Sequence, residues 1–185
     1  TEAYLRRFGK FIQSLSGKYI TAEDVNMNTA DMEYISMETK YVTGLPESMG
    51  GGGDPSPVTA YGVYMGIKAT AKKVFGTDDL GGKKIGVQGV GQVGSYLVER
   101  LVKENAKVTI TDISEEKMKA IAKRFGVDTI DQDKIYDLDM DIYSPCALGA
   151  SLNDDTIPRL KCALVAGGAN NQLKEELKHG NMLLD

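Results

Sequence analysis

Three glycines at positions 89, 91 and 94 have the spacing GxGxxG and come directly after a β-branched run, residues 85–88. In a strand–turn–helix segment, Gly89 would permit the tight turn and Gly91 would let a diphosphate approach the backbone. Gly94 would let the following helix pack closely on the strand. That helix, starting near Gln92, would direct its N–H groups and the positive end of its dipole at the phosphates. The segment therefore predicts a dinucleotide site.

A carboxylate follows the next strand of the predicted pattern. Asp112 directly follows the run 108–111, about 20 positions beyond the turn. Dinucleotide-binding domains carry at this distance the acid that binds the adenosine ribose. This context gives weight to a GxGxxG motif, which alone often occurs by chance. A carboxylate there would repel a 2′-phosphate and favours NAD over NADP, although Lys117 and Lys119 leave that choice open. A turn or helix-capping role for Asp112 explains less, because Ser114 is available as the cap.

Two further loops stand at the ends of later strands, residues 144–149 and 167–171. In open α/β sheets, ligands bind beyond the carboxyl ends of the strands. Small residues followed by the amides of Asn170 and Asn171 suit a nicotinamide ribose and carboxamide. Both loops could equally be turns that end strands, which is the favoured interpretation of Asn171 if no ligand binds.

Short β-branched runs alternate with amphipathic helices from Lys83 onward. Strict alternation of this kind favours parallel strands with right-handed crossovers. We therefore expect an α/β fold with a doubly wound parallel sheet of the Rossmann type. The expected strands are 84–88, 107–111, 127–130, 141–143, 162–166 and 182–184, and the helices between them include 92–104 and 114–125.

A long helix is expected just before this pattern, with Ser56 as its N-cap, Pro57 at its first position and Gly76 as its stop. Gly62 and Gly66 lie one turn apart within it, and glycine costs about 1 kcal/mol relative to alanine inside a helix. The pair predicts either a second backbone packed closely on that face or a merely weak helix.

Residues 1–56 form a first region, with a helix ending at Gly17, an extended piece near 19–21 and a helix over 29–38. This is too little chain to bury a core alone. The run 49–55, with four consecutive glycines, predicts a hinge or ligand-hugging loop, or else a flexible linker. Because the chain opens inside a helical pattern and ends in an apolar run, we expect further segments on both sides.

Composition narrows the classes of partner. The 22 basic and 26 acidic residues give a net charge of -4 without any block of like charge, which argues against nucleic acid or an anionic membrane. Two cysteines without metal-ligand spacing favour a reducing compartment and predict no metal site. Without a membrane-length apolar run or a secretion signal, we expect a soluble, cytoplasmic protein. We expect buried thiols at Cys146 and Cys162, no nucleophilic role for Cys146, and a solvated helix cap at His179.

Five segments, in order along almost the whole chain, resemble the glutamate/leucine/phenylalanine/valine dehydrogenase superfamily, and within it the enzymes that act on leucine. They are YITAEDV at 19–25, DPSPVTAYGV at 54–63, QGVGQVG at 88–94, DIYSPCALGA at 141–150 and ANNQLK at 169–174. Five separate motifs in the family's order make coincidence a poor explanation.

The resemblance implies NAD-dependent oxidative deamination of a branched-chain L-amino acid to the 2-oxo acid and ammonia, by a homo-oligomer. Asp24 matches the catalytic carboxylate that relays protons to and from the amino group, a role that desolvation in a closing cleft would support. Thr59 matches a threonine that contacts the nicotinamide amide. The full set expected around the cofactor is Thr59, Gly89, Val90, Gly91, Gln92, Val93, Gly94, Asp112, Ile113, Cys146, Ala147, Leu148, Ala169, Asn170 and Asn171.

One departure from the family limits what this chain is expected to do alone. The family's catalytic and carboxylate-binding lysines precede the region that begins at Thr1, and its C-terminal helices follow the region that ends at Asp185. Residues 1–56 would then be a remnant of the substrate domain and 57–185 the NAD-binding domain, which binds NAD but catalyses little. The alternatives are a phenylalanine or glutamate dehydrogenase, and a non-catalytic NAD-binding module.

Overall fold

The structure, a computed structural model, describes residues 1–184. The chain divides into two compact units, Thr1–Pro55 and a second that begins at Ser56, and each is described by itself. Within 1–184, no helix combines the length and the apolar character that crossing a bilayer requires.

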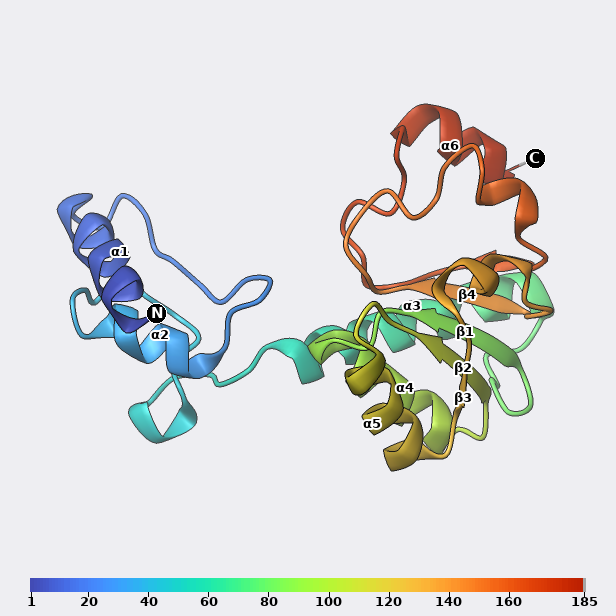
Figure 1. Cartoon of the computed structure of the whole chain (residues 1–185), viewed down its shortest axis with the longest axis horizontal. Helices are drawn as coiled ribbons and strands as arrows, with labels where there is room; N and C mark the ends of the chain where they lie inside the picture. The colour runs from blue at the N-terminus through green and yellow to red at the C-terminus, as the bar shows by residue number, and fades with distance from the viewer. Residues whose placement is uncertain (185) are drawn as a thin grey trace. The chain divides into compact units, whose positions relative to one another are not determined.

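The first unit contains two α-helices, α1 (Glu2–Ser14) and α2 (Thr29–Ser36), joined and followed by extended loops (Figure 1). The α2 helix starts at Asn28, whose side chain accepts the Asp31 N–H while the Asp31 carboxylate accepts the Asn28 N–H. This reciprocal capping box fixes where the helix begins. A one-turn 3-10 helix, η1 (Glu47–Met49), follows later in the unit.

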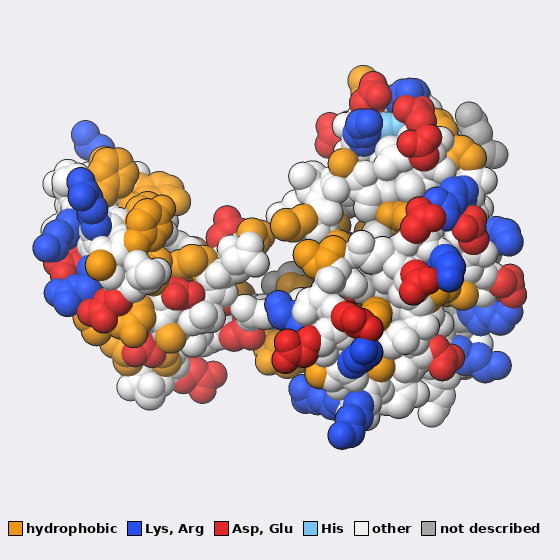
Figure 2. Space-filling view, in the orientation of Figure 1, with side chains coloured by type: hydrophobic (Ala, Val, Ile, Leu, Met, Phe, Trp, Pro, Cys, Tyr) orange, Lys and Arg blue, Asp and Glu red, His pale blue; other side chains and the backbone are white. Residues whose placement is uncertain are grey.

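The first unit has a small core and an apolar exterior. Leu5, Met32 and Ile35 form its buried cluster. Tyr4 and Phe11 on α1 are 70% and 59% exposed, and Figure 2 shows hydrophobic side chains gathered over this helix. These few buried side chains fit the expectation that the region has too little chain for a substantial core of its own.

A five-stranded parallel sheet organises the second unit, with the strands in the order β3-β2-β1-β4-β5. The chain builds outward from β1 in one direction and then returns to its other side, which confirms the predicted doubly wound α/β fold. The carboxyl ends of β1 and β4 meet where the order reverses. The strands are β1 (Lys84–Gln88), β2 (Lys107–Thr111), β3 (Asp128–Thr129), β4 (Ile142–Pro145) and β5 (Leu164–Val165).

Helices cover one face of this sheet, and shorter elements cover the other. The main core joins Ile85 and Val87 of β1 to Ile67 of α3, Leu97 of α4 and partly buried side chains of α5. The second core is formed by the opposite face with residues of the short 3-10 helices and the loops around them. These elements are α3 (Ser56–Phe75), α4 (Gln92–Lys103), α5 (Glu115–Phe125), η2 (Gln132–Asp137), η3 (Ile157–Arg159) and α6 (Glu176–Leu184) (Figure 1).

Local signals set the ends of these helices as expected. The Ser114 side chain accepts the Lys117 N–H at 3.3 Å and caps α5, while Gly126 ends α5 in the left-handed conformation, with φ +67°. The prediction that Ser114 acts as a cap is confirmed. The α3 helix begins at Ser56, as the Ser-Pro signal predicts.

One expected strand is wrong. Residues 182–184 lie in α6 rather than in a strand, and Met182 packs against the second core, since a three-residue apolar run fits either element. Of the two alternatives for Gly62 and Gly66, close packing of a second backbone does not apply among the described residues, because a Cβ added to either glycine would meet open space.

Candidate functional site

The glycine turn leaves β1 at the carboxyl edge of the sheet and is held by both neighbouring strands. The Gly89 N–H donates to the Thr111 carbonyl at 2.8 Å, and the Cys146 N–H donates to the Gln88 carbonyl at 2.7 Å. Gly89 has φ +94°, and a Cβ there would lie 2.7 Å from the Ala147 nitrogen. Only glycine fits this position without strain.

The second and third glycines of the turn differ in what surrounds them. A Cβ on Gly94 would lie 2.0 Å from the Gly89 carbonyl oxygen, so Gly94 lets α4 rest directly on the turn. A Cβ on Gly91 would meet nothing within 4 Å and would project into open space. Gly91 is the N-cap of α4, where the first N–H groups of a helix lack partners within the helix. This space, the helix end and the bare backbone fit a diphosphate.

Asp112 lies beside this turn and is bonded to it. Its Oδ2 accepts the Val90 N–H at 2.8 Å, and its Oδ1 accepts the Ser114 N–H at 2.8 Å. The carboxylate therefore does stabilise a turn. Because an ionised carboxylate offers about four acceptor positions, two remain for the hydroxyls of a ribose.

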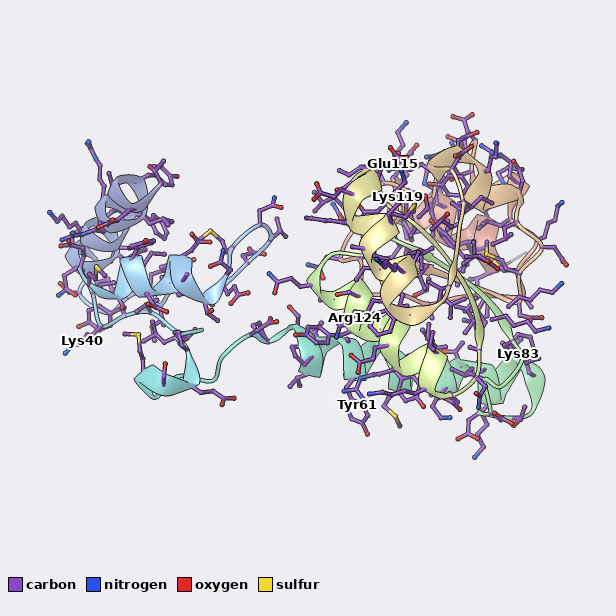
Figure 3. The ribbon with its side chains drawn as sticks, turned by 60° about the horizontal axis from the view of Figure 1, so that its bottom comes forward. Lys40, Tyr61, Lys83, Glu115, Lys119 and Arg124 are labelled. Carbon is purple, nitrogen blue, oxygen red and sulfur yellow. The ribbon has the colours of Figure 1, made fainter. Side chains whose placement is uncertain are left out.

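The lysines that complicate the choice between NAD and NADP lie on α5. Lys119 Nζ lies 2.7 Å from Glu115 Oε1, one helical turn away, and both side chains are exposed (Figure 3). An ammonium already paired with a carboxylate is a weaker site for a 2′-phosphate than an unpaired one.

The loop after β4 packs against the turn. Burial raises the pKa of the Cys146 thiol, which leaves it protonated at neutral pH, and the Ser144 hydroxyl lies 3.8 Å from its sulfur. A protonated thiol is a poor nucleophile. Cys146 and Cys162 are partly rather than fully buried. Ala147 contacts the turn through Gly89, whereas the side chain of Leu148 is 72% exposed.

The loop after β5 meets the loop after β4. The Ala169 N–H donates to the Pro145 carbonyl at 3.0 Å, and a Cβ on Gly168 would lie 3.2 Å from the Val93 side chain. The Asn171 carbonyl accepts the Ala150 N–H at 2.8 Å. This backbone bond gives Asn171 a structural role in joining the loops, and the Asn170 side chain is exposed.

Most predicted cofactor residues therefore meet at one edge of the sheet, but two of them, and the predicted catalytic residue, are placed differently. Ile113 is 88% exposed beyond Asp112, and Thr59 is exposed on the first turns of α3. The start of α3 is linked to the turn, because the Ser56 hydroxyl donates to Gln92 Oε1 at 3.2 Å. Asp24 belongs to the first unit, where its exposed carboxylate accepts the Val25 N–H at 2.7 Å.

The sequence analysis missed two buried polar features of the second unit. The Gln88 amide is bonded by two tyrosine hydroxyls beneath the glycine turn. His179 is completely buried rather than solvated, and its Nδ1 accepts the Glu175 N–H at 2.8 Å. Its Nε2 then carries the ring proton and faces Asp154 Oδ2 at 3.7 Å. The only sequence signal for His179 was its one-turn spacing from Glu175.

Known proteins with similar sequences are amino acid dehydrogenases. A family profile described as glutamate/leucine/phenylalanine/valine dehydrogenase matches residues 50–115. The leucine dehydrogenase of Thermoactinomyces intermedius is 56% identical over 182 residues, which are 98% of this chain and 50% of that protein. The L-tryptophan dehydrogenase of Nostoc punctiforme is 42% identical over 183 residues, 99% of this chain and 51% of that protein. The chain spans about half the length of the curated relatives that it matches.

Solved structures share the fold. The crystal structure of L-tryptophan dehydrogenase from Nostoc punctiforme matches all of this chain and 52% of its own, with a TM-score of 0.75 and 40% identity. The hetero-hexameric glutamate dehydrogenase of Thermus thermophilus matches 99% of this chain and 49% of its own at a TM-score of 0.75, but at 21% identity it supports the fold alone. From its glycine turn, its strand order and these relatives, the chain belongs to the glutamate/leucine/phenylalanine/valine dehydrogenase family.

Proposed function

We propose that the second unit binds NAD, and that the chain is part of an enzyme that oxidatively deaminates a branched-chain L-amino acid to the 2-oxo acid and ammonia. The observation that carries the proposal is the open space over Gly91, beside a carboxylate that is fixed against Val90. A diphosphate requires open space over the backbone of the turn, and a ribose requires a carboxylate beside it.

Each part of the candidate site has a task in this proposal. Backbone N–H groups at the start of α4 hold the diphosphate, helped by the helix dipole. Asp112 accepts hydrogen bonds from the adenosine ribose and disfavours a 2′-phosphate. The loops after β4 and β5 flank the nicotinamide half, with Ala147, Leu148, Ala169 and Asn170 at its edge. NAD, when bound, supplies the acceptor for the hydride that leaves the substrate α-carbon.

Asp24 is the proposed proton carrier. Its carboxylate is exposed and oriented by the Val25 N–H, so one oxygen has a fixed position while acceptor capacity remains. A positioned carboxylate can take a proton from an amino group and return it. This role follows the match of the EDV segment, Glu23–Val25, to the family.

The leucine-like substrate is supported by the order of the relatives. Proteins named leucine dehydrogenase are 51–56% identical to the chain, whereas the L-tryptophan and phenylalanine dehydrogenases are 41–42% identical. An aromatic substrate is the alternative within the same chemistry. We further propose that the enzyme assembles as a homo-oligomer.

The second candidate is an NAD-binding module without catalysis, in which the nucleotide site of the second unit is the functional part. Calorimetric titration of the chain with NADH and NADPH tests the nucleotide site. We expect NADH to bind more tightly, and no heat with either nucleotide would refute the site. Turnover assays of a protein carrying this segment with the relatives' remaining length, on leucine, valine, phenylalanine and glutamate, separate an enzyme from a module.

A further inference from the structure

A buried polar network lies beneath the glycine turn, on the face of the sheet opposite α4. The Tyr143 hydroxyl donates to Gln88 Oε1, and Gln88 Nε2 donates to the Tyr136 hydroxyl at 2.8 Å. Tyr143 is 0% and Tyr136 7% exposed, and their rings lie 5.9 Å apart. Both ends of the Gln88 amide are thus occupied by partners that have little freedom to move.

The amide of Gln88 uses both of its ends in this network. Its Oε1 accepts from the Tyr143 hydroxyl, and its Nε2 donates to the Tyr136 hydroxyl oxygen. Burial raises the pKa of the Tyr143 hydroxyl, so it remains a neutral donor. An apolar residue at position 88 would lose both hydrogen bonds.

Gln88 occupies the central position at the carboxyl edge. It is the last residue of β1, paired in register with Thr111 of β2 and Pro145 of β4. Its carbonyl accepts the Cys146 N–H at 2.7 Å, and the next residue is Gly89. The backbone of Gln88 therefore sets where both the glycine turn and the loop after β4 begin.

The network also fixes the strand that leads into the loop after β4. Tyr143 belongs to β4 (Ile142–Pro145), and its hydroxyl is held by Gln88 of β1. The loop that follows β4 is bonded in turn to the loop after β5, because the Ala150 N–H donates to the Asn171 carbonyl at 2.8 Å. The buried hydrogen bonds of Gln88 thus tie the root of the glycine turn to the root of the loop after β4.

We propose that Gln88 is a positioning residue for the dinucleotide site, holding the glycine turn in the place where the diphosphate binds. The effect on affinity rests on the proposed NAD binding. The effect of Gln88 on the order of the glycine turn does not depend on it. Gln88 contacts no nucleotide in this scheme and acts only through the turn and loops that its network supports. Its loss should weaken binding beyond what the loss of stability explains.

The experiment compares variants of the chain at matched stability. Gln88→Met keeps the length of the side chain and removes both hydrogen bonds, and Tyr143→Phe removes one donor. Val108→Ala is the control: it opens a cavity in the main core, on β2 and away from the network. Affinity for NADH is measured by calorimetry at a temperature where circular dichroism shows every variant fully folded, and deuterium uptake is followed over residues 89–94.

We expect Gln88→Met to weaken NADH binding about tenfold, the effect of losing roughly one net hydrogen bond, and to speed deuterium uptake over the turn. Tyr143→Phe should act in the same direction. In the Gln88→Met/Tyr143→Phe double variant, the loss of NADH affinity should be smaller than the sum of the two single losses, because both changes break the same hydrogen bond. Unchanged affinity and uptake in Gln88→Met, or equal changes in Val108→Ala, would overturn the inference. If the unmodified chain binds no NADH, the proposed function fails, and deuterium uptake alone decides the positioning role.

Discussion

Replacing Gly91 by alanine tests the candidate site at the point where the structure makes the clearest distinction. Gly91 has φ -66°, which an L-residue adopts, and its added Cβ would meet no protein atom within 4 Å. The variant should therefore fold, with its stability changed by about 1 kcal/mol or less, because the reduced freedom of the unfolded chain is offset by the poor fit of alanine at an N-cap. The new methyl group stands where a diphosphate would approach the backbone.

The expected loss of affinity follows from the contact that is prevented. A hydrogen bond between a backbone N–H and a charged phosphate contributes about 1.5–3 kcal/mol. Since about 1.4 kcal/mol corresponds to tenfold, Gly91→Ala should raise the Kd for NADH roughly 10- to 100-fold. Calorimetry gives the Kd, and a thermal melt by circular dichroism confirms that the fold is intact.

Two other glycines serve as controls for Gly91→Ala. Gly66→Ala also places a methyl group in open space, but on α3, so it should stabilise the helix by about 1 kcal/mol and leave NADH affinity unchanged. Gly94→Ala should instead destabilise the fold by about 1–3 kcal/mol or more, because its Cβ would lie 2.0 Å from the Gly89 carbonyl oxygen. If Gly91→Ala bound NADH as tightly as the parent chain, the diphosphate could not lie against this turn.

Three further predictions concern charged groups. Asp112→Ala should weaken NADH binding about tenfold and narrow the preference over NADPH, measured by paired titrations; unchanged discrimination would exclude the ribose role. Asp24→Asn, in a full-length protein containing this segment, should cut turnover at least 100-fold with NADH affinity unchanged, and retained turnover would leave Asp24 without a catalytic role. Burial alone would raise the pKa of Glu104, but hydrogen bonds from Lys68, Tyr64 and the Leu80 N–H outweigh it and lower that pKa below 4.5. The charged Glu104 should stabilise the fold by about 1–3 kcal/mol relative to Glu104→Gln. This difference in the free energy of unfolding should be complete above pH 4.5 and should fade as the pH falls through the lower folded-state pKa. A difference in denaturant melts that does not change with pH would contradict this.

The sequence predicted the parts of the fold that are set by local chemistry. Alternating β-branched runs and amphipathic segments placed β1, β2, α4 and α5 within a residue or two, and the resulting edge of the sheet collected the glycine turn and Asp112. The strand predicted at residues 182–184 was wrong because three apolar residues are too few to show a period. Their helical state goes with packing of Met182 against the second core, which is built from residues elsewhere in the sequence.

The polar network and the buried histidine could not be predicted for a related reason. Gln88 lies 48 residues before Tyr136 and 55 before Tyr143, and a half-buried glutamine at a strand end has no distinctive spacing. His179 looked exposed because its neighbours are charged, whereas the fold turns its ring inward. Partners that only tertiary structure brings together leave no pattern along the chain.

The seating of Gly94 against the Gly89 carbonyl has a kinetic consequence. Since this close contact and the left-handed Gly89 restrict the backbone on both sides of Gly91, the turn has little conformational freedom to lose when a ligand binds. Association should resemble the docking of two rigid bodies, with a single exponential phase in stopped-flow records whose rate rises linearly with nucleotide concentration. Nucleotide soaked into preformed crystals should enter this turn without cracking the lattice.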